Sequence, residues 1–317
     1  MTKKKKKSKK GIENKFLSVL LILVTVIVGI CFSEIDGTYS ANMVSDNNDN
    51  INAQEVIKEI NDDLRVSFLD VGQADSILIE NKDEAMLIDA GNNEDGKLLV
   101  KYFNNLGITN FKYLVGTHPH EDHIGGMDDV INNFEVETIY LPDCFTTTKT
   151  FVDVLDAMEN KNINYTVPKI GDSFELGDAI LEVIYTGNDA NDLNNSSIVL
   201  RLTYGNNSFL FMGDATSKVE KKILSSKRNV KADVLKVGHH GSKYSSTNDF
   251  LDKVNPKYAI ISAGIGNSYK HPHDVTLRKL EKRSIIIHRT DMEGTIIATS
   301  DGENITITNI KTNLNGG

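Results

Sequence analysis

Short apolar runs rich in Val, Ile, Leu and Phe recur from Leu64 almost to the end of the chain, separated by polar turns and helix-like patterns. Such runs predict buried strands when turn signals bound them, whereas apolar residues spaced three and four apart predict helices. Strands are predicted at 64–80 (two, divided by a Gly-Gln turn), 85–91, 111–117, 196–205, 207–214, 232–238, 258–264, 295–300 and 304–310. Helices are predicted at 96–106, from 217 onward, at 248–254 and at 274–282. This alternation predicts an α/β domain over residues 64–317.

One helix start has a local signature. Ser217 and Glu220 stand three residues apart before an apolar pattern, as in a capping box. We therefore expect Ser217 to cap the helix that follows.

The N-terminal part has a different pattern. Residues 1–15 are strongly basic, and residues 16–33 are 18 uncharged, mainly apolar residues. We expect residues 1–15 to be a cytoplasmic flank. A basic flank before such a run predicts a transmembrane anchor with the rest of the chain outside the cell membrane; a cleaved signal peptide, which would release a secreted protein, is the alternative. Residues 34–63 are rich in Asn, Asp and Ser, which predicts a flexible stalk with a short helix around 53–60. Of the two cysteines, Cys31 falls in the apolar run, so the folded part has no predicted disulfide.

Charge narrows the choice of partners. The chain carries −9, but residues 1–15 contain eight lysines and one glutamate, so the remainder carries −16. Nucleic-acid binders usually have a basic footprint, and an acidic domain therefore restricts any polyanion site to a local basic area or a metal centre. The candidates for a basic area, with solvated surface as the alternative, are Lys236, Lys243, Lys253, Lys257 and Lys270.

Histidine and aspartate are concentrated in one short loop. The stretch GTHPHEDHIGGMDD starts at Gly116, directly after a predicted strand, and contains His118, His120, Asp122 and His123. Imidazole and carboxylate are the usual ligands of zinc, manganese and iron. His118 and His120 can face one ion, and Asp122 and His123 can face a second.

Three later motifs extend this set. MGD ends in Asp214, which is a candidate to bridge two ions, and Gly213 lets the backbone come close. VGHHGS supplies His239 or His240 as a further ligand. KHPHD supplies His271 and His273, which either belong to the site or only begin a helix at Asp274. Since all these residues follow predicted strands, we expect them at one edge of the sheets.

The chain resembles a known family. The motif THPHEDH after a strand, with a later GD, is the signature of the metallo-β-lactamase fold. The order FLDVGQADSILIE, LIDAG, THPHEDHIGG, NNSSIVLRL, FLFMGD, DVLKVGHHGS, YAIISAG, HPH and HRTDMEGTI further resembles the extracellular metallohydrolase domain of ComEC-type competence proteins, which form DNA-uptake channels. The resemblance covers Leu64–Ile310 and implies a four-layer αββα sandwich with the metal site at one edge of its two sheets. With at most one predicted span, the chain looks like an anchored, stand-alone version of that domain.

The sequence departs from the wider family's ligand set. The usual histidine before the GD aspartate is missing from NDLNNSSIVL, and the usual last histidine is missing near Ser262. We expect His240, with His271 or His273, to take their place, and Asn195 or Ser196 to orient substrate. Both two-ion and single-ion occupancy, with zinc or manganese, remain open.

These residues predict a metal-dependent hydrolase. The first functional hypothesis is a phosphodiesterase acting on DNA or RNA, and the second is a phosphorylcholine-esterase-like enzyme acting on cell-envelope phosphodiesters. A non-catalytic binding module is the third, and nothing indicates a protein partner. In the enzymatic hypotheses Asp122 holds an ion and orients the attacking group, while His273, and after it His271, is the candidate acid.

Overall fold

The computed structural model describes residues 63–311. The predicted flank at 1–15, anchor at 16–33, and stalk with its short helix lie outside the described residues, as do 312–317. Within 63–311, no helix is both long and apolar enough to cross a bilayer.

Two β-sheets form the centre of the described part of the chain. The first has eight strands in the order β15-β14-β1-β2-β3-β4-β5-β6, and the second has seven in the order β13-β12-β11-β10-β9-β8-β7. The strands of the first sheet are β1 (Leu64–Phe68), β2 (Ser76–Asn81), β3 (Glu84–Ala90), β4 (Asn110–Val115), β5 (Glu135–Tyr140), β6 (Tyr165–Thr166), β14 (Thr295–Ser300) and β15 (Ile305–Ile310). Those of the second are β7 (Ser173–Leu176), β8 (Ala179–Tyr185), β9 (Val199–Tyr204), β10 (Asn207–Phe211), β11 (Val234–Lys236), β12 (Tyr258–Ile261) and β13 (Ile286–Arg289).

Each sheet has an antiparallel part and a parallel part. Strands β3 to β6 pair in parallel in the first sheet, and β10 to β13 pair in parallel in the second. Parallel pairs need crossover connections, and helices supply them. The α-helices are α3 (Gly96–Asn105), α4 (Glu121–Ile124), α5 (Met127–Asn133), α6 (Lys149–Asn160), α7 (Ser217–Ser226), α8 (Asn248–Val254), α9 (Asp274–Glu281) and α10 (Thr290–Glu293).

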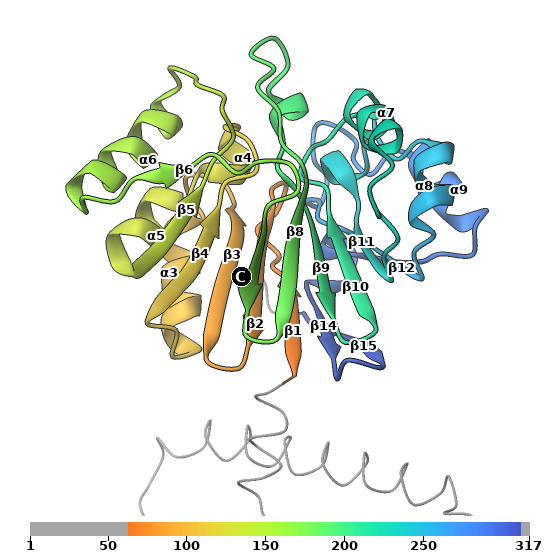
Figure 1. The fold of residues 1–317 in the computed structure, drawn as a ribbon, viewed down its shortest axis with the longest axis horizontal. Coiled ribbons are helices and arrows are strands. Elements are labelled where there is room, and N and C mark those ends of the chain that lie inside the picture. The colour runs from red at the N-terminus through yellow and green to blue at the C-terminus, as the bar shows by residue number, and fades with distance from the viewer. Residues whose placement is uncertain (1–62, 312–317) are drawn as a thin grey trace, which may run out of the picture. The chain divides into compact units, whose positions relative to one another are not determined.

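The helices cover the outer faces of the two sheets, so the predicted four-layer αββα order is confirmed. Helices α3, α5 and α6 lie outside the first sheet, and α7, α8 and α9 lie outside the second (Figure 1). Three clusters of buried apolar side chains fill the spaces between the layers, one between the sheets and one under each group of helices.

Strand β10 shows how the sequence builds these layers. Its side chains alternate between the two faces of the sheet. Phe209 and Phe211 belong to the cluster between the sheets, whereas Leu210, with Met212 just beyond the strand, belongs to the cluster under α7 and α8. All five residues of β10 are buried, which explains its continuous apolar run.

The predicted capping box is wrong. Thr216, not Ser217, caps α7, and its hydroxyl accepts a hydrogen bond from the Lys218 amide. Glu220 turns away from α7, and its carboxylate accepts hydrogen bonds from the amides of Ser246 and Thr247 and from the Thr247 hydroxyl. Because Thr247 is the residue before α8, Glu220 fixes the start of a neighbouring helix.

Candidate metal centre

Four chain segments meet where strands of the two sheets end. His118 and His120 follow β4 directly, and Asp122 and His123 lie on the short helix α4. Asp214 follows β10, and a 3₁₀ turn after β11, Gly238–Gly241, holds His239 and His240. Strands β4, β10 and β11 each pair in parallel with a neighbour, and the carboxyl ends of such strands are where α/β sites form.

The glycines of THPHEDHIGG allow this loop to pack closely. The Gly125 amide donates to the Gly91 carbonyl oxygen at 2.9 Å. A Cβ atom on Gly125 would lie 2.2 Å from the backbone of Asn92. A larger residue would therefore push α4, with its Asp122 and His123, away from the end of β3.

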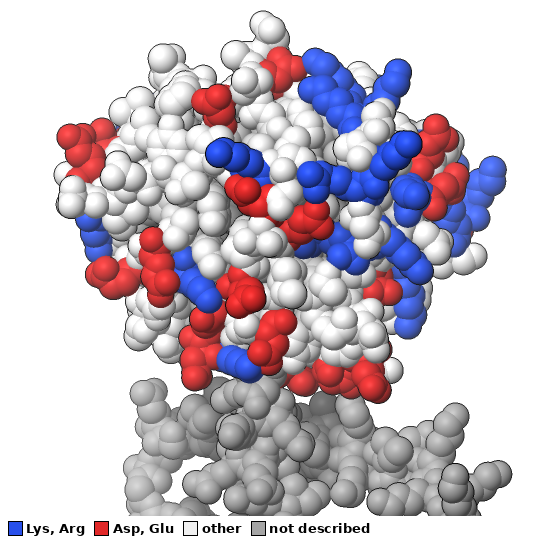
Figure 2. All heavy atoms as spheres, in the orientation of Figure 1, with Lys and Arg blue, Asp and Glu red and all other residues white. Residues whose placement is uncertain are grey.

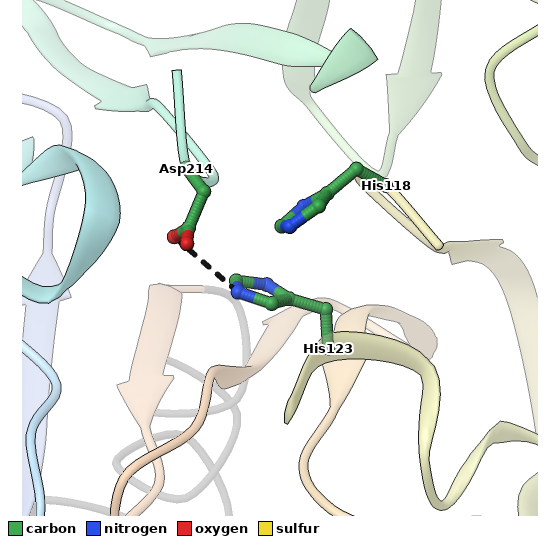
Figure 3. Close-up of side chains that lie close together, drawn as sticks. All are labelled: His118, His123 and Asp214. Carbon is green, nitrogen blue, oxygen red and sulfur yellow. Dashed lines mark ion pairs between the residues drawn. The ribbon is translucent and has the colours of Figure 1, made fainter. Parts of the chain in front are cut away.

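Histidine and aspartate atoms converge at the centre of the site. His123 Nε2 lies 3.3 Å from Asp214 Oδ1, and His240 Nε2 lies 3.6 Å from the same oxygen and 3.3 Å from Asp122 Oδ2. His118, His123 and Asp214 point toward one another (Figure 3). Ligand atoms about 2.1 Å from one ion lie about 3–3.4 Å apart, so these separations suit shared coordination.

His118 and His120 form a second pair. His118 Nε2 lies 2.9 Å from His120 Nδ1. The other ring nitrogen of His118 faces the Thr117 hydroxyl at 3.2 Å. Because that hydroxyl already donates to Asp89, it accepts from His118, which leaves the lone pair of His118 on Nε2, toward His120.

Unpartnered buried atoms test whether these residues fit a metal ion. His123 Nε2, His240 Nε2 and Asp214 Oδ1 are buried and have no hydrogen-bond partner among the described residues. His240 Nδ1 lies 3.0 Å from the Ser262 carbonyl oxygen, which can only accept, so in the neutral ring Nε2 carries the lone pair. Buried polar atoms are almost always paired. Two imidazole nitrogens, which offer lone pairs once their protons are displaced, and a carboxylate oxygen face one another, and this set fits divalent cations.

His239 and His240 adopt an unusual backbone conformation. Both have positive φ values, 53° and 51°, in the left-handed region that L-residues avoid at roughly 1–2 kcal/mol each. This conformation turns both rings toward Asp214, with His239 Nε2 3.6 Å from Oδ2 and His240 Nε2 3.6 Å from Oδ1. The sequence left open which of the two histidines is the ligand, and the geometry lets both serve.

Asp89 holds Thr117 and His123, at the two ends of the first histidine motif, in place. Its carboxylate accepts from the Thr117 amide at 2.7 Å and from the Thr117 hydroxyl at 2.8 Å, and it lies 2.8 Å from His123 Nδ1. A carboxylate behind a ligating histidine fixes the ring orientation and the tautomer. Asp89 stands in LIDAG, a motif for which the sequence predicts no role in the site.

Asp75 and Lys236 form a buried ion pair behind His240. The Lys236 ammonium lies 2.8 Å from Asp75 Oδ2, and the side chains are 0% and 1% exposed. Asp75 Oδ1 lies 3.4 Å from His240 Nδ1. The prediction of Lys236 as part of a surface basic area is therefore wrong, because its strand β11 is buried between sheet neighbours.

The carboxylates set the charge of the histidines. Burial alone would lower the pKa of His123, but Asp214, Asp89 and Asp122 outweigh it and raise that pKa well above its ordinary value. For His240, Asp214 and Asp75 likewise outweigh burial and raise the pKa to about 10. Burial and the charge on His123 hold the pKa of His118 well below its ordinary value.

A cleft of about 530 Å³ opens onto these residues. Among the predicted site residues, His120, Asp122, Asp214, His239, His240 and His271 line it. His271 is 9% exposed, and burial together with the charges of His240 and His239 lowers its pKa to about 4. His273 does not line the cleft, and its Nδ1 accepts a hydrogen bond from the Lys243 amide at 3.2 Å. Its acid role stays an untested prediction.

The two residues expected to orient substrate, Asn195 and Ser196, do not line the cleft. The Asn195 side chain accepts from the Thr216 hydroxyl and donates to Asp189 and Asp192, away from the cleft. Ser196 hydrogen-bonds to the Asp189 backbone. Asn194 lines the cleft instead, and its Oδ1 has no hydrogen-bond partner among the described residues.

The fold and the motif order decide the family. Residues 69–265, more than half of the chain, match the model described as "Metallo-beta-lactamase superfamily". The chain belongs to this superfamily. Solved structures agree at the level of the fold: the metallo-beta-lactamase fold protein YhfI from Bacillus subtilis matches with a TM-score of 0.53 and 12% identity, covering 75% of this chain and 100% of that one.

Similar sequences in this superfamily include competence proteins, as the motif order predicted. ComE operon protein 3 of Bacillus subtilis is 33% identical over 250 residues, which cover 73% of this chain and 32% of that protein. Competence protein ComA of Neisseria gonorrhoeae is 27% identical over 235 residues, which cover 73% of this chain and 31% of that protein. The chain thus spans about a third of the length of these relatives.

Proposed function

We propose that this superfamily member is a metal-dependent phosphodiesterase. The observation that carries the proposal is the convergence of three buried atoms without hydrogen-bond partners, His123 Nε2, His240 Nε2 and Asp214 Oδ1. Asp214 and His240 line an open cleft, which brings a substrate next to this group of atoms. Fold alone does not fix a reaction, so the chemistry must be argued from these side chains.

We assign the residues to two ligand groups that share Asp214. His118 and His120, with His239, would hold one ion, and Asp122, His123 and His240 would hold the other. The mixed imidazole and carboxylate set suits zinc or manganese. Such a pair of ions, when bound, supplies Lewis acidity on both sides of a phosphate.

The cleft residues would act on the substrate itself. The side chain of Asp122 is 30% exposed, so it reaches the cleft while remaining next to His240. Its pKa is lowered to about 2, because the charges on His123 and His240 outweigh burial, so at neutral pH it is a carboxylate that can accept a hydrogen bond from a water molecule and orient it. His271 is neutral at pH 7 and can donate a hydrogen bond to a phosphate oxygen from the wall of the cleft.

A substrate panel tests this proposal. The purified full-length chain, with manganese or zinc added, is offered single-stranded DNA, bis-p-nitrophenyl phosphate, p-nitrophenylphosphorylcholine and nitrocefin. We expect hydrolysis of the diesters and none of nitrocefin. Activity on p-nitrophenylphosphorylcholine alone would favour the cell-envelope alternative, and activity on nitrocefin alone would refute a phosphodiesterase. Binding of DNA without hydrolysis of any compound would favour the non-catalytic module.

We also propose that residues 16–33 anchor the chain in the cell membrane with the metal centre outside. The basic flank at 1–15 and the uncharged run after it support this orientation. Protease added to intact cells after wall removal should digest the domain and leave a membrane-bound stub. Protection of the domain would contradict the orientation, and its release into the medium would contradict the anchor.

A further inference from the structure

A continuous strip of ring-bearing and basic side chains runs from the cleft onto the surface. At its inner end Tyr269 stacks on His271, with ring centroids 5.7 Å apart and an angle of 21° between the planes. The rings of His271 and His273 follow at 4.9 Å. Beyond them the Lys243 amide donates to His273 Nδ1, and the Lys243 ammonium lies 5.2 Å from the centre of the Tyr244 ring. We call these five residues the Tyr269–Tyr244 strip.

The two tyrosines at its ends are exposed rather than packed. Tyr269 is 64% exposed and Tyr244 is 62% exposed, although Tyr269 and its neighbour His271 both line the cleft. Tyrosine usually buries its ring when it serves the fold. The strip therefore presents two free ring faces, one beside the candidate metal centre and one farther out.

The strip belongs to the basic half of an otherwise acidic domain. Residues 201–290 contain 17 Lys and Arg against 7 Asp and Glu, a net charge of +10, whereas residues 63–200 contain 8 against 25, a net charge of −17. Lys and Arg gather over the side of the molecule that carries α7, α8 and α9 (Figure 2). Lys243 lies within the strip, and Lys270 is the chain neighbour of Tyr269. Although the domain as a whole is negative, the part formed by residues 201–290 is positive and attracts polyanions.

We propose that the Tyr269–Tyr244 strip binds single-stranded nucleic acid. Bases stack on the exposed faces of Tyr269 and Tyr244, Lys243 and Lys270 contact phosphates, and the strand leads past His271 into the cleft. Aromatic platforms beside a basic groove bind single strands with little sequence preference, because every base has a stacking face. This inference rests on the proposed phosphodiesterase function and adds the class of substrate.

The same features disfavour the cell-envelope substrates. A phosphorylcholine group needs a site that accepts a quaternary ammonium, and the lysine next to each exposed tyrosine repels that cation. A polymer of sugar or glycerol phosphates would be attracted by the lysines, but it has no flat ring to stack on the tyrosines. Only a polyanion with bases can place its phosphates on the lysines and its bases on the tyrosines.

Binding without catalysis tests the strip separately from the reaction. Fluorescence anisotropy is measured on the full-length chain in chelator, so that no strand is cut, with a labelled 12-nucleotide oligothymidylate and an abasic oligonucleotide of the same length. Tyr244→Ala and Tyr269→Ala should each weaken oligothymidylate binding roughly 5- to 150-fold, the usual effect of losing one stacked base. Tyr244→Phe and Tyr269→Phe keep the ring and should bind within about twofold of the unchanged chain. Phe145→Ala removes an equally exposed ring outside the cleft lining and should have no effect.

The outcomes separate this inference from the function on which it rests. If the alanine variants bind as tightly as the unchanged chain, or if the abasic strand binds as tightly as oligothymidylate, the strip does not stack bases and the inference is overturned. Hydrolysis of bis-p-nitrophenyl phosphate by the same preparation with metal restored shows whether the phosphodiesterase itself stands. Weakened oligothymidylate binding in both alanine variants, with diester hydrolysis intact in the unchanged chain and in Phe145→Ala, is the result that we expect.

Discussion

Asp214 carries the most weight among the single residues of the site. Its Oδ1 faces His123 and His240, and its Oδ2 faces His239, so one carboxylate meets both ligand groups. Gly213 before it has a positive φ of 49°, and the Asp214 amide donates to the Ser197 hydroxyl at 3.1 Å. The backbone that positions this carboxylate is thus fixed by the fold.

Asp214→Asn should abolish metal uptake and nearly all activity. The amide has the size of the carboxylate but lacks its charge, and it cannot bridge two cations. Elemental analysis and diester hydrolysis measure both losses. Asn194→Ala, on the same cleft but outside both ligand groups, is the control that should still bind metal. An Asp214→Asn protein with normal metal content would remove Asp214 from the ligand set.

The ion pair of Asp75 and Lys236 predicts a non-additive pair of substitutions. Lys236→Met or Asp75→Asn alone leaves one charge buried, and each should reduce the free energy of unfolding by about 3–5 kcal/mol. The double variant buries neither charge, so its loss should be well below the sum of the two. Denaturant unfolding of the four metal-free proteins measures this. Strict additivity would mean that the two groups do not interact.

His271→Ala should slow hydrolysis by roughly 10- to 150-fold, as expected when a hydrogen bond to a charged phosphate is lost. Because its lowered pKa makes His271 a poor proton donor at neutral pH, the loss should be the same for good and poor leaving groups. Rates on phosphodiesters with p-nitrophenolate and with alkoxide leaving groups provide the comparison. A loss confined to the poor leaving group would instead make His271 the acid.

At the scale of elements, the loop after β11 depends on neighbouring helices. Glu220 of α7 accepts hydrogen bonds from the Ser246 and Thr247 amides at the start of α8. These amides follow the Gly238–Gly241 turn, which holds His239 and His240. The sequence could not predict this partner, because Ser217 and Glu220 have a spacing that suits a local cap equally well. Thr216, which caps α7 in place of Ser217, stands only one residue earlier.

Glu220→Ala should lower the free energy of unfolding by about 1–3 kcal/mol, because it leaves buried amides without an acceptor. Thermal or denaturant unfolding measures the change. Glu281→Ala, on the exposed side of α9, is the matched control and should change stability little. Equal effects of the two substitutions would show that the contact of Glu220 with α8 contributes nothing.

Elements between residues 135 and 185 were missed although their sequence signals are present. Helix α6 has a Thr148 cap and apolar side chains at Phe151, Val154 and Met158, and β7 and β8 flank a Gly-Asp turn. In contrast, β4 and β10 were predicted from their continuous apolar runs, which lead into the histidine and aspartate motifs. The β7–β8 hairpin carries no such motif, so nothing in the sequence drew attention to its shorter apolar runs.

At the scale of the whole molecule, the fold and the ligand loops followed from the sequence, whereas the residues behind them did not. His118 and His120 lie in the motif THPHEDH, and Asp214 ends the motif MGD, so the sequence alone points to them. Asp75 and Lys236 are 161 residues apart, and only the packing of the two sheets brings them together. The sequence could not show that Asn194 rather than Asn195 lines the cleft, because the 3₁₀ turn that contains both determines which side chain faces it.

Metal affinity should rise steeply with pH. In the metal-free chain His240 has a pKa raised from 6.5 to about 10, and His123 is raised as well, so both carry protons at pH 7 that a metal must displace. The same protonation affects the stability of the metal-free chain. The stabilising charge interactions of the protonated histidines are fully present below about pH 6.5 and are lost as the pH rises through about 10. Competition with a chelator at pH 6.5 and pH 8.5 should give tighter binding at pH 8.5. An affinity independent of pH would contradict the charge assignment.

Titration of metal-free protein with manganese or zinc, followed by diester hydrolysis and by bound metal in the same samples, tests the central proposal most directly. We expect no hydrolysis without metal, activity that rises to a plateau near two ions per chain, and loss of both signals in the variant His118→Ala/His120→Ala. Hydrolysis that persists in metal-free protein, or a chain that takes up no metal, would contradict the proposal.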